Sequence, residues 1–131
     1  MPQRKLKPPG TRRPALPKAS EEMKAWSAAL IAEVATWPNV TTRPMFGFTS
    51  LYRKSRIFAA LPKTRGMESP HAFGFKLDSL SRRFVRRLRC EPRVRTIEDF
   101  SKTRWLTFEM NSADDFSSAL EWLNWAYEAA R

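Results

Sequence analysis

The chain has 131 residues, a formal net charge of +11 and 42% hydrophobic residues, among them 5 Trp and 9 Phe. This length suits a single domain with a real hydrophobic core, because typical domains hold about 100–150 residues. The absence of any run of about 18 apolar residues excludes a membrane-spanning helix, so no membrane partner is expected. The lone cysteine and the lack of a signal-peptide pattern together predict a cytoplasmic protein.

The positive charge is concentrated in two parts of the sequence. Residues 1–18 hold six basic and no acidic side chains, and residues 79–104 hold nine basic and three acidic ones. Residues 105–131 are acidic by contrast, with one basic and five acidic side chains. Such polarised charge is typical of a protein that binds a polyanion.

The N-terminal segment, residues 1–18, is predicted to be a disordered basic arm. It contains 5 of the 10 prolines and few large apolar groups, so it cannot bury enough surface to offset the entropy of ordering. The folded domain is expected to span residues 19–131. It begins with a helix that Ser20 caps and Pro38 ends, whose apolar residues recur at spacings of three and four: Met23, Trp26, Leu30, Val34 and Trp37.

A hairpin is predicted next, between about Phe48 and Leu61, with polar Lys54 and Ser55 at the bend. Gly47 precedes it and suits a bulge or a close backbone approach. The polar loop 62–70 follows and is a candidate for function because of its length and its place near the sheet edge. The alternation of apolar and other residues in 72–77 then predicts a further strand.

The most basic element is the helix predicted after Asp78 or Ser79, either of which can cap it, and before Pro92. Its apolar residues Leu80, Phe84, Val85 and Leu88 are expected to face the core. The opposite face carries five arginines: Arg82, Arg83, Arg86, Arg87 and Arg89. Further basic residues that could extend this surface are Arg93, Arg95, Lys102 and Arg104.

Short strands are expected at 94–97 and 104–110, and Ser112 is expected to begin the last helix. The complete prediction is an α+β domain in which an antiparallel sheet of about four to six strands is packed by three helices.

The sequence resembles the TfoX N-terminal domain family and its YjbR-like relatives, which are small α+β domains. The resemblance covers about residues 20–130 and rests on short motifs: Arg43-x-Met45-Phe46-Gly47, Leu51-Tyr52, Ile57-Phe58-Ala59, Phe75-Lys76 and the apolar pairs of the final helix. Phe48 and Ser55 stand where members usually have glycine. Residues 105–108, before Asp114-Asp115, are also similar to a bacterial domain called luciferase-like. The TfoX resemblance implies DNA binding or transcriptional regulation and no catalytic residue.

Residue types that support catalysis or metal binding are scarce. His71 and Cys90 are the only His and Cys, and the sequence places a strand and a helix between them. Neither has the spaced partners that a zinc site needs, and the acidic pair Asp114-Asp115 is explained by capping of a helix. We therefore expect no metal, no cofactor and no catalytic residue.

The leading hypothesis is a non-enzymatic module that binds DNA or another polyanion electrostatically through the five helix arginines, because phosphates relieve the repulsion between them. The alternative interpretation is that this arginine face is exposed to solvent and pairs with Glu91 or with acids of the last helix.

A second hypothesis is a module that binds a protein partner or a small apolar ligand, with a pocket lined by Met45, Phe46, Tyr52 and Trp105. An enzyme would require His71, Cys90 and carboxylates to converge. The oligomeric state is left open.

Overall fold

The computed structural model describes residues 16–77, 82–96 and 104–130. Its strands are β1 (Val40–Met45), β2 (Phe48–Arg53), β3 (Arg56–Pro62), β4 (Ala72–Lys76), β5 (Val94–Thr96) and β6 (Trp105–Glu109). Its helices are α1 (Glu21–Val34), α2 (Arg82–Arg89) and α4 (Phe116–Ala129), and a short 3-10 turn, η1 (Ala113–Asp115), precedes α4.

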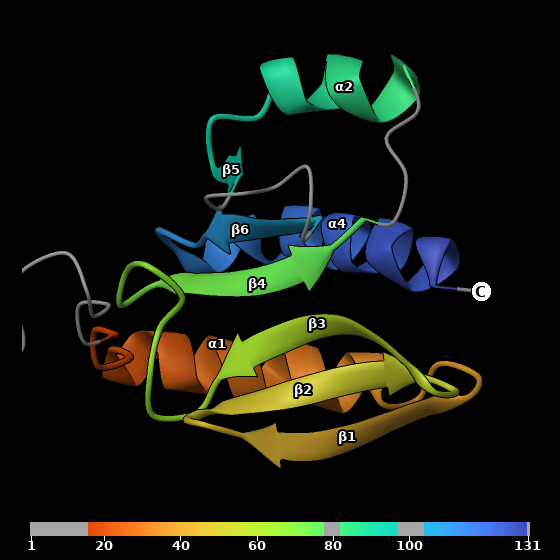
Figure 1. Ribbon diagram of the computed structural model, residues 1–131. Helices are drawn as coiled ribbons and strands as arrows, with labels where there is room; N and C mark the ends of the chain where they lie inside the picture. Colours follow the sequence, from red (N-terminus) through yellow and green to blue (C-terminus); the bar gives the residue numbers. More distant parts are fainter. Residues whose placement is uncertain (1–15, 78–81, 97–103, 131) are drawn as a thin grey trace, which may run out of the picture.

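The six strands form one antiparallel sheet in the order β1-β2-β3-β4-β6-β5 (Figure 1). The first three strands are consecutive hairpins, whereas β6 inserts between β4 and β5. The sheet and the three helices confirm the predicted α+β class.

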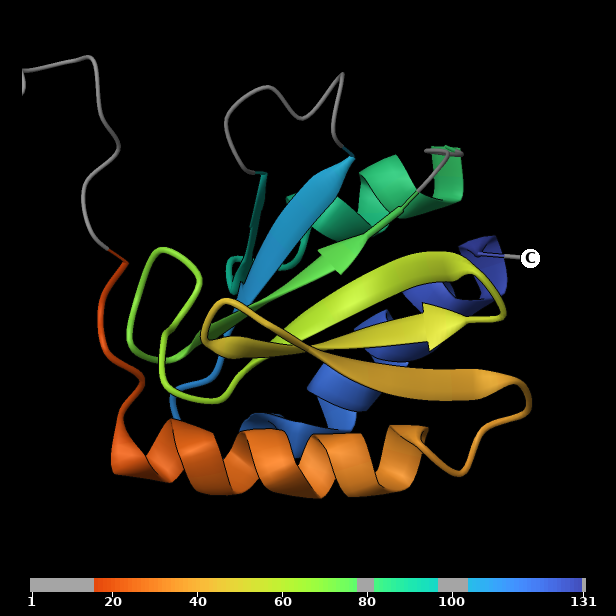
Figure 2. The ribbon, with the colours of Figure 1, turned by 60° about the horizontal axis from the view of Figure 1, so that its bottom comes forward.

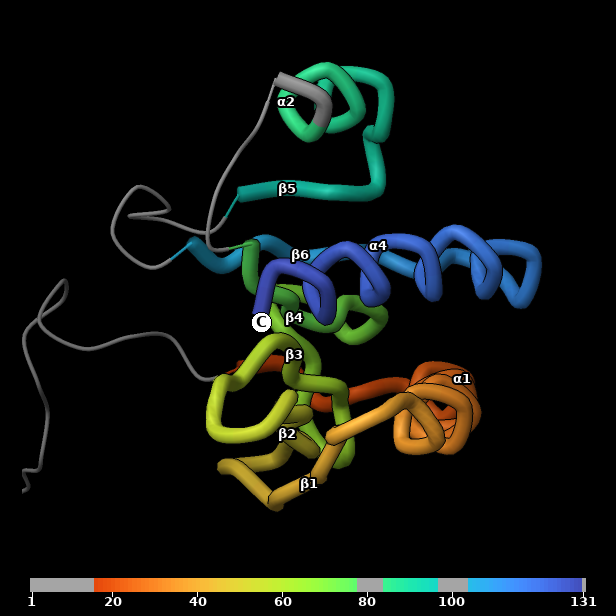
Figure 3. The backbone as a smooth tube through the Cα atoms, turned by 90° about the vertical axis from the view of Figure 1, so that its right-hand side faces the viewer, coloured from red at the N-terminus to blue at the C-terminus, as the bar shows by residue number. Residues whose placement is uncertain are grey.

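The two long helices, α1 and α4, cover the same face of the sheet, and α2 lies beyond the β5 edge (Figure 3). The core fills the space between these helices and the strands. Its largest fully buried side chains include Phe58, Phe73, Phe75, Phe108 and Trp122. Phe73 of β4 and Phe108 of β6 stack with their ring centroids 5.4 Å apart, as expected for directly paired residues.

Helix α1 begins as the sequence predicts. The Ser20 side chain accepts a hydrogen bond of 3.0 Å from the backbone N–H of Met23, and Glu21 and Glu22 lie in the first turn. The helix ends at Val34, before Pro38, and Trp37 leaves it to pack edge-on against Tyr127 of α4 with a centroid distance of 5.2 Å.

The predicted hairpin is confirmed as β2 and β3, which turn at Lys54 and Ser55. Strand β1, in contrast, is not evident from the sequence pattern because it is an edge strand whose middle residues are all exposed. Pro44 occupies this strand, which is compatible with an edge because no neighbour requires its missing N–H.

The chain enters the domain alongside the loop between β3 and β4 (Figure 2). Lys18 forms an antiparallel bridge with Arg65, and Gly66 donates its N–H to the carbonyl of Pro17 at 2.9 Å. The predicted arm, residues 1–18, falls mostly outside the described residues. Its last three residues are described, and they belong to this pairing.

Three other predictions concern residues that the structure does not describe: the helix cap at Asp78 or Ser79, the position of Leu80 and the end of the short strand at Ile97. Within the described ranges, no helix is long and apolar enough to cross a membrane.

Candidate polyanion-binding surface

Helix α2 contains five arginines, three apolar residues and no acid. Its apolar residues, Phe84, Val85 and Leu88, are half-buried. The ring of Phe84 packs edge-on against Trp125 of α4 with a centroid distance of 5.0 Å. This contact fixes one face of α2 against α4, so the remaining face is directed away from the core, as expected from the spacing.

Arg87 is the α2 arginine that the structure ties to α4. Its Nη2 lies 2.9 Å from Oε1 of Glu121, and its guanidinium lies 5.1 Å from the centre of the Trp125 ring. Arg87 therefore fits the alternative interpretation, in which arginines of this helix pair with acids of the last helix. Both side chains of the pair are about half exposed, so the ion pair contributes at most about 1 kcal/mol.

Arg86 and Arg89 are exposed, and neither has an acidic partner in the part of the chain that the structure describes. They lie three residues apart, which places them on neighbouring positions of one helix edge. The backbones of Arg82 and Arg83 belong to the first turn of α2, but their side chains lie outside the described part. Of the five predicted site residues, two thus present unneutralised charge and one is neutralised.

Arg93 follows α2 and was expected to extend the basic surface, but it belongs to a partly buried ion cluster. Its Nε and Nη2 donate to the two carboxylate oxygens of Glu91 at 2.6 and 2.9 Å, and its Nη1 donates to Asp115 Oδ1 at 2.7 Å. The guanidinium also lies over the Phe108 ring at 5.3 Å. Arg93 is therefore not available to a ligand, whereas Arg95 on β5 is exposed.

The same cluster lowers the pKa values of its two acids. Burial raises the pKa of Glu91, but the hydrogen bonds and charge of Arg93 outweigh it, so the pKa lies below the ordinary value of 4.5. The pKa of Asp115 lies below 3.8 because hydrogen bonds from the Asn111 and Ser112 backbones and from Arg93 outweigh its burial. Glu91, Asp115 and Glu121 are therefore already ion-paired, and none is left to neutralise Arg86 or Arg89.

Asp115 also closes a capping box with Ser112 at the start of η1, the turn that precedes α4, so capping explains this acid. Cys90 is exposed just after α2, while His71 precedes β4 and faces Trp26 of α1 at a centroid distance of 6.3 Å. Among the described residues, no group of three His, Cys, Asp or Glu side chains could hold a metal ion.

The four residues suggested for a ligand pocket are not brought together. Phe46 lies in the turn between β1 and β2, whereas Tyr52 pairs with Thr41 toward the other end of these strands. Trp105 lies on β6, separated from β2 by β3 and β4. Its ring packs near Gly74, where an added Cβ would be 3.3 Å from it. The structure thus does not form the predicted pocket from these side chains.

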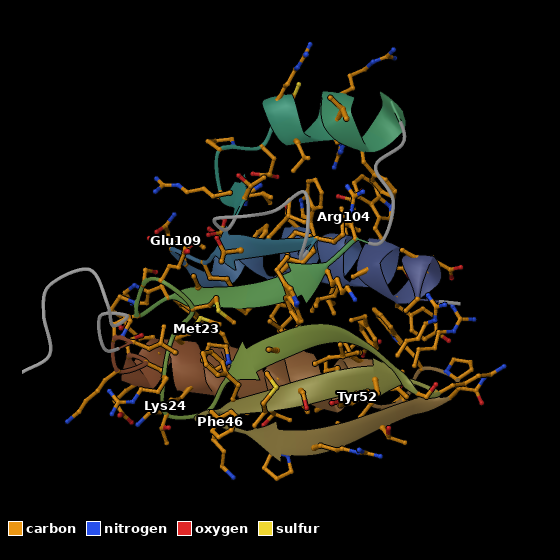
Figure 4. All side chains as sticks on the ribbon, in the orientation of Figure 1. Met23, Lys24, Phe46, Tyr52, Arg104 and Glu109 are labelled. Carbon is orange, nitrogen blue, oxygen red and sulfur yellow. The ribbon has the colours of Figure 1, made fainter. Side chains whose placement is uncertain are left out.

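One exposed side chain was not recognised as a separate feature from the sequence. Phe46 is 95% exposed and stands at the tip of the β1–β2 turn (Figure 4). The signal for it was present, because an aromatic residue directly before glycine occupies a position where tight hairpins favour Asn or Asp.

No family model, no curated protein and no solved structure matches this chain.

Proposed function

We propose that this protein is a non-enzymatic, cytoplasmic binding module of the TfoX N-terminal kind that binds nucleic acid electrostatically. The proposed contacts to phosphate are the arginines of α2: Arg82, Arg83, Arg86, Arg87 and Arg89. The sequence resemblance supports a regulatory role. Its most distinctive motif, Arg43-x-Met45-Phe46-Gly47, forms the end of β1 and the turn into β2.

The observation that carries the proposal is uncompensated positive charge. Arg86 and Arg89 are exposed without an acid in the described part, while Glu91, Asp115 and Glu121 are bound to other arginines. Like charges at helical spacing repel one another, so α2 gains from an anionic partner. The phosphates of a nucleic acid provide such charges at regular spacing, and an arginine can contact two of their oxygens at once.

Contacts of this kind position a protein on the nucleic-acid backbone and carry no direct information about base sequence. We therefore expect affinity that depends strongly on salt and weakly on sequence. Changing Arg86 and Arg89 together to Gln should weaken binding to duplex DNA. It should also reduce the slope of log affinity against log salt concentration by about two, which is about one for each lost phosphate contact.

The measurement is fluorescence anisotropy of a labelled DNA duplex over a range of salt concentrations. The matched control is the double variant Lys54→Gln and Arg56→Gln, which removes the same charge from the exposed β2–β3 turn. It should keep the slope of the unmodified protein. Equal slopes for the two double variants would show that net charge alone, and not α2, attracts the DNA.

A further inference from the structure

We infer that the turn at Phe46 and Gly47 is a stacking contact for an unpaired base, so that the nucleic acid bound at this end is single-stranded. The inference rests on the proposed function and narrows its substrate class. It concerns the opposite end of the sheet from α2, because β1 and β5 are the two edge strands.

The loop behind the turn holds the backbone at Phe46 and Gly47 in place. Met45 pairs with Phe48, so only Phe46 and Gly47 connect the two strands, with φ angles of 43° and 91°. The Gly47 carbonyl accepts backbone N–H groups from Lys63, Thr64 and Arg65 at 2.9, 2.9 and 3.1 Å. A Cβ at Gly47 would lie 2.7 Å from Arg65 Cγ, so the turn is packed tightly against the loop behind it.

The fold itself gives no reason for phenylalanine at this position. The side chain is 95% exposed, so it contributes almost nothing to the core. Its backbone is left-handed, which disfavours bulky side chains and suits Asn or Gly. Asn followed by Gly is the preferred pair for a two-residue turn with positive φ at both positions. The left-handed conformation of a bulky residue is the unusual feature here, and such outliers occur most often at ligand-binding sites.

The surroundings of Phe46 are basic, which indicates what that ligand is. Lys63 beside the turn is exposed, whereas the guanidinium of Arg43 on β1 lies over the Tyr52 ring, farther along the strands from the turn. Lys18 is exposed as well and pairs with Arg65, whose Nη1 donates to the Leu16 carbonyl at 3.1 Å.

An aromatic ring surrounded by cations matches the two chemical groups of a single strand. Every base has a flat π-face that can stack on phenylalanine, while the adjacent phosphates pair with lysine and arginine. In a duplex the bases are already stacked on one another, so Phe46 should distinguish the two forms. An apolar groove on a protein partner would bind the ring, but it would not require the basic side chains beside the turn.

The test measures the affinity of Phe46→Asn for a labelled 20-nucleotide single strand and for a duplex of the same length. We expect about tenfold weaker binding to the single strand, since one base–aromatic stack typically accounts for about fivefold to 150-fold, and at most a twofold change for the duplex. The thermal midpoint should rise, because Asn suits the left-handed backbone. Phe46→Trp should retain the affinity for the single strand.

The matched control is Leu16→Asn, which removes the second large apolar side chain that is exposed in the described part of the chain, and it should leave both affinities unchanged. Unchanged affinity of Phe46→Asn for the single strand would overturn the inference, and so would an equal loss for both nucleic acids. If Phe46→Asn lost co-sedimentation with phosphatidylglycerol vesicles but still bound the single strand as the unmodified protein does, the ring would be assigned to a lipid surface instead. The double variant Arg86→Gln and Arg89→Gln tests the proposed function separately, because it should weaken duplex binding whatever Phe46 does.

Discussion

Replacing Arg93 with Met is expected to lower the free energy of unfolding by about 3 kcal/mol at neutral pH, because it leaves a buried carboxylate without its counter-ion. Arg93 makes two hydrogen bonds to Glu91, which is only 8% exposed, and one to Asp115. The cluster joins the residues after α2 to the start of α4. Its loss should therefore also loosen the attachment of α2.

The contribution of Glu91 to the pH dependence of stability should have the opposite sign in the Arg93→Met variant from that in the unmodified protein. In the unmodified protein the pKa values of Glu91 and Asp115 are depressed, so the cluster stabilises the fold fully above about pH 5. This stability is lost as the pH falls below the ordinary pKa values, which are 4.5 for Glu91 and 3.8 for Asp115, and then through the lower pKa values of the folded protein. Without Arg93, burial raises the pKa of Glu91 above its ordinary value of 4.5, so protonation of Glu91 as the pH falls should recover stability.

Urea unfolding followed by tryptophan fluorescence at pH 7, 5 and 3.5 checks both expectations. The matched control is Arg95→Met on β5, because Arg95 is exposed and lies two residues from Arg93. Its unfolding free energy should stay within about 0.5 kcal/mol of the unmodified value. An Arg93→Met protein as stable as this control would mean that the cluster is too well solvated to matter.

The elements that the sequence predicted well are those whose pattern follows from burial on one face. Apolar residues at helical spacing marked α1 and α4, and the alternation in 72–77 marked β4. Strand β1 has no such pattern because it is an exposed edge. Its strand conformation depends on pairing with β2, which composition alone does not reveal.

The surface charges were harder to assign because ion pairs form between residues that are distant in the sequence. Arg87 and Glu121 are 34 residues apart, and Arg93 and Asp115 are 22 apart. The sequence showed which residues are basic and that α2 carries five of them. Only the packing of α2 on α4 separates the bound Arg87 from the exposed Arg86 and Arg89. The exposure of Phe46 likewise depends on the β1–β2 turn, which the interpretation of Gly47 as a bulge or a close backbone approach did not include.

Replacing Gly66 with Ala is expected to lower the free energy of unfolding by about 2–3 kcal/mol, which is typical when a tightly packed site is overfilled. A Cβ at this position would lie 1.9 Å from the Ser69 carbonyl oxygen, which belongs to the backbone and cannot rotate away. The loop must therefore shift. Because Gly66 donates to the Pro17 carbonyl, the shift should also release residues 16–18 and increase cleavage by protease just before α1.

Gly74→Ala is the matched control for this substitution. An added Cβ at Gly74 would meet the end of the Met67 side chain at 2.9 Å and the Trp105 ring at 3.3 Å, and the flexible Met67 can move aside. We expect it to cost less than half as much as Gly66→Ala in urea unfolding and to leave the protease pattern unchanged. Equal destabilisation by the two substitutions would mean that the loop adapts as easily as a methionine side chain. In that case the loop could not hold the Phe46 turn in one position, since the Gly47 carbonyl is bound by this same loop.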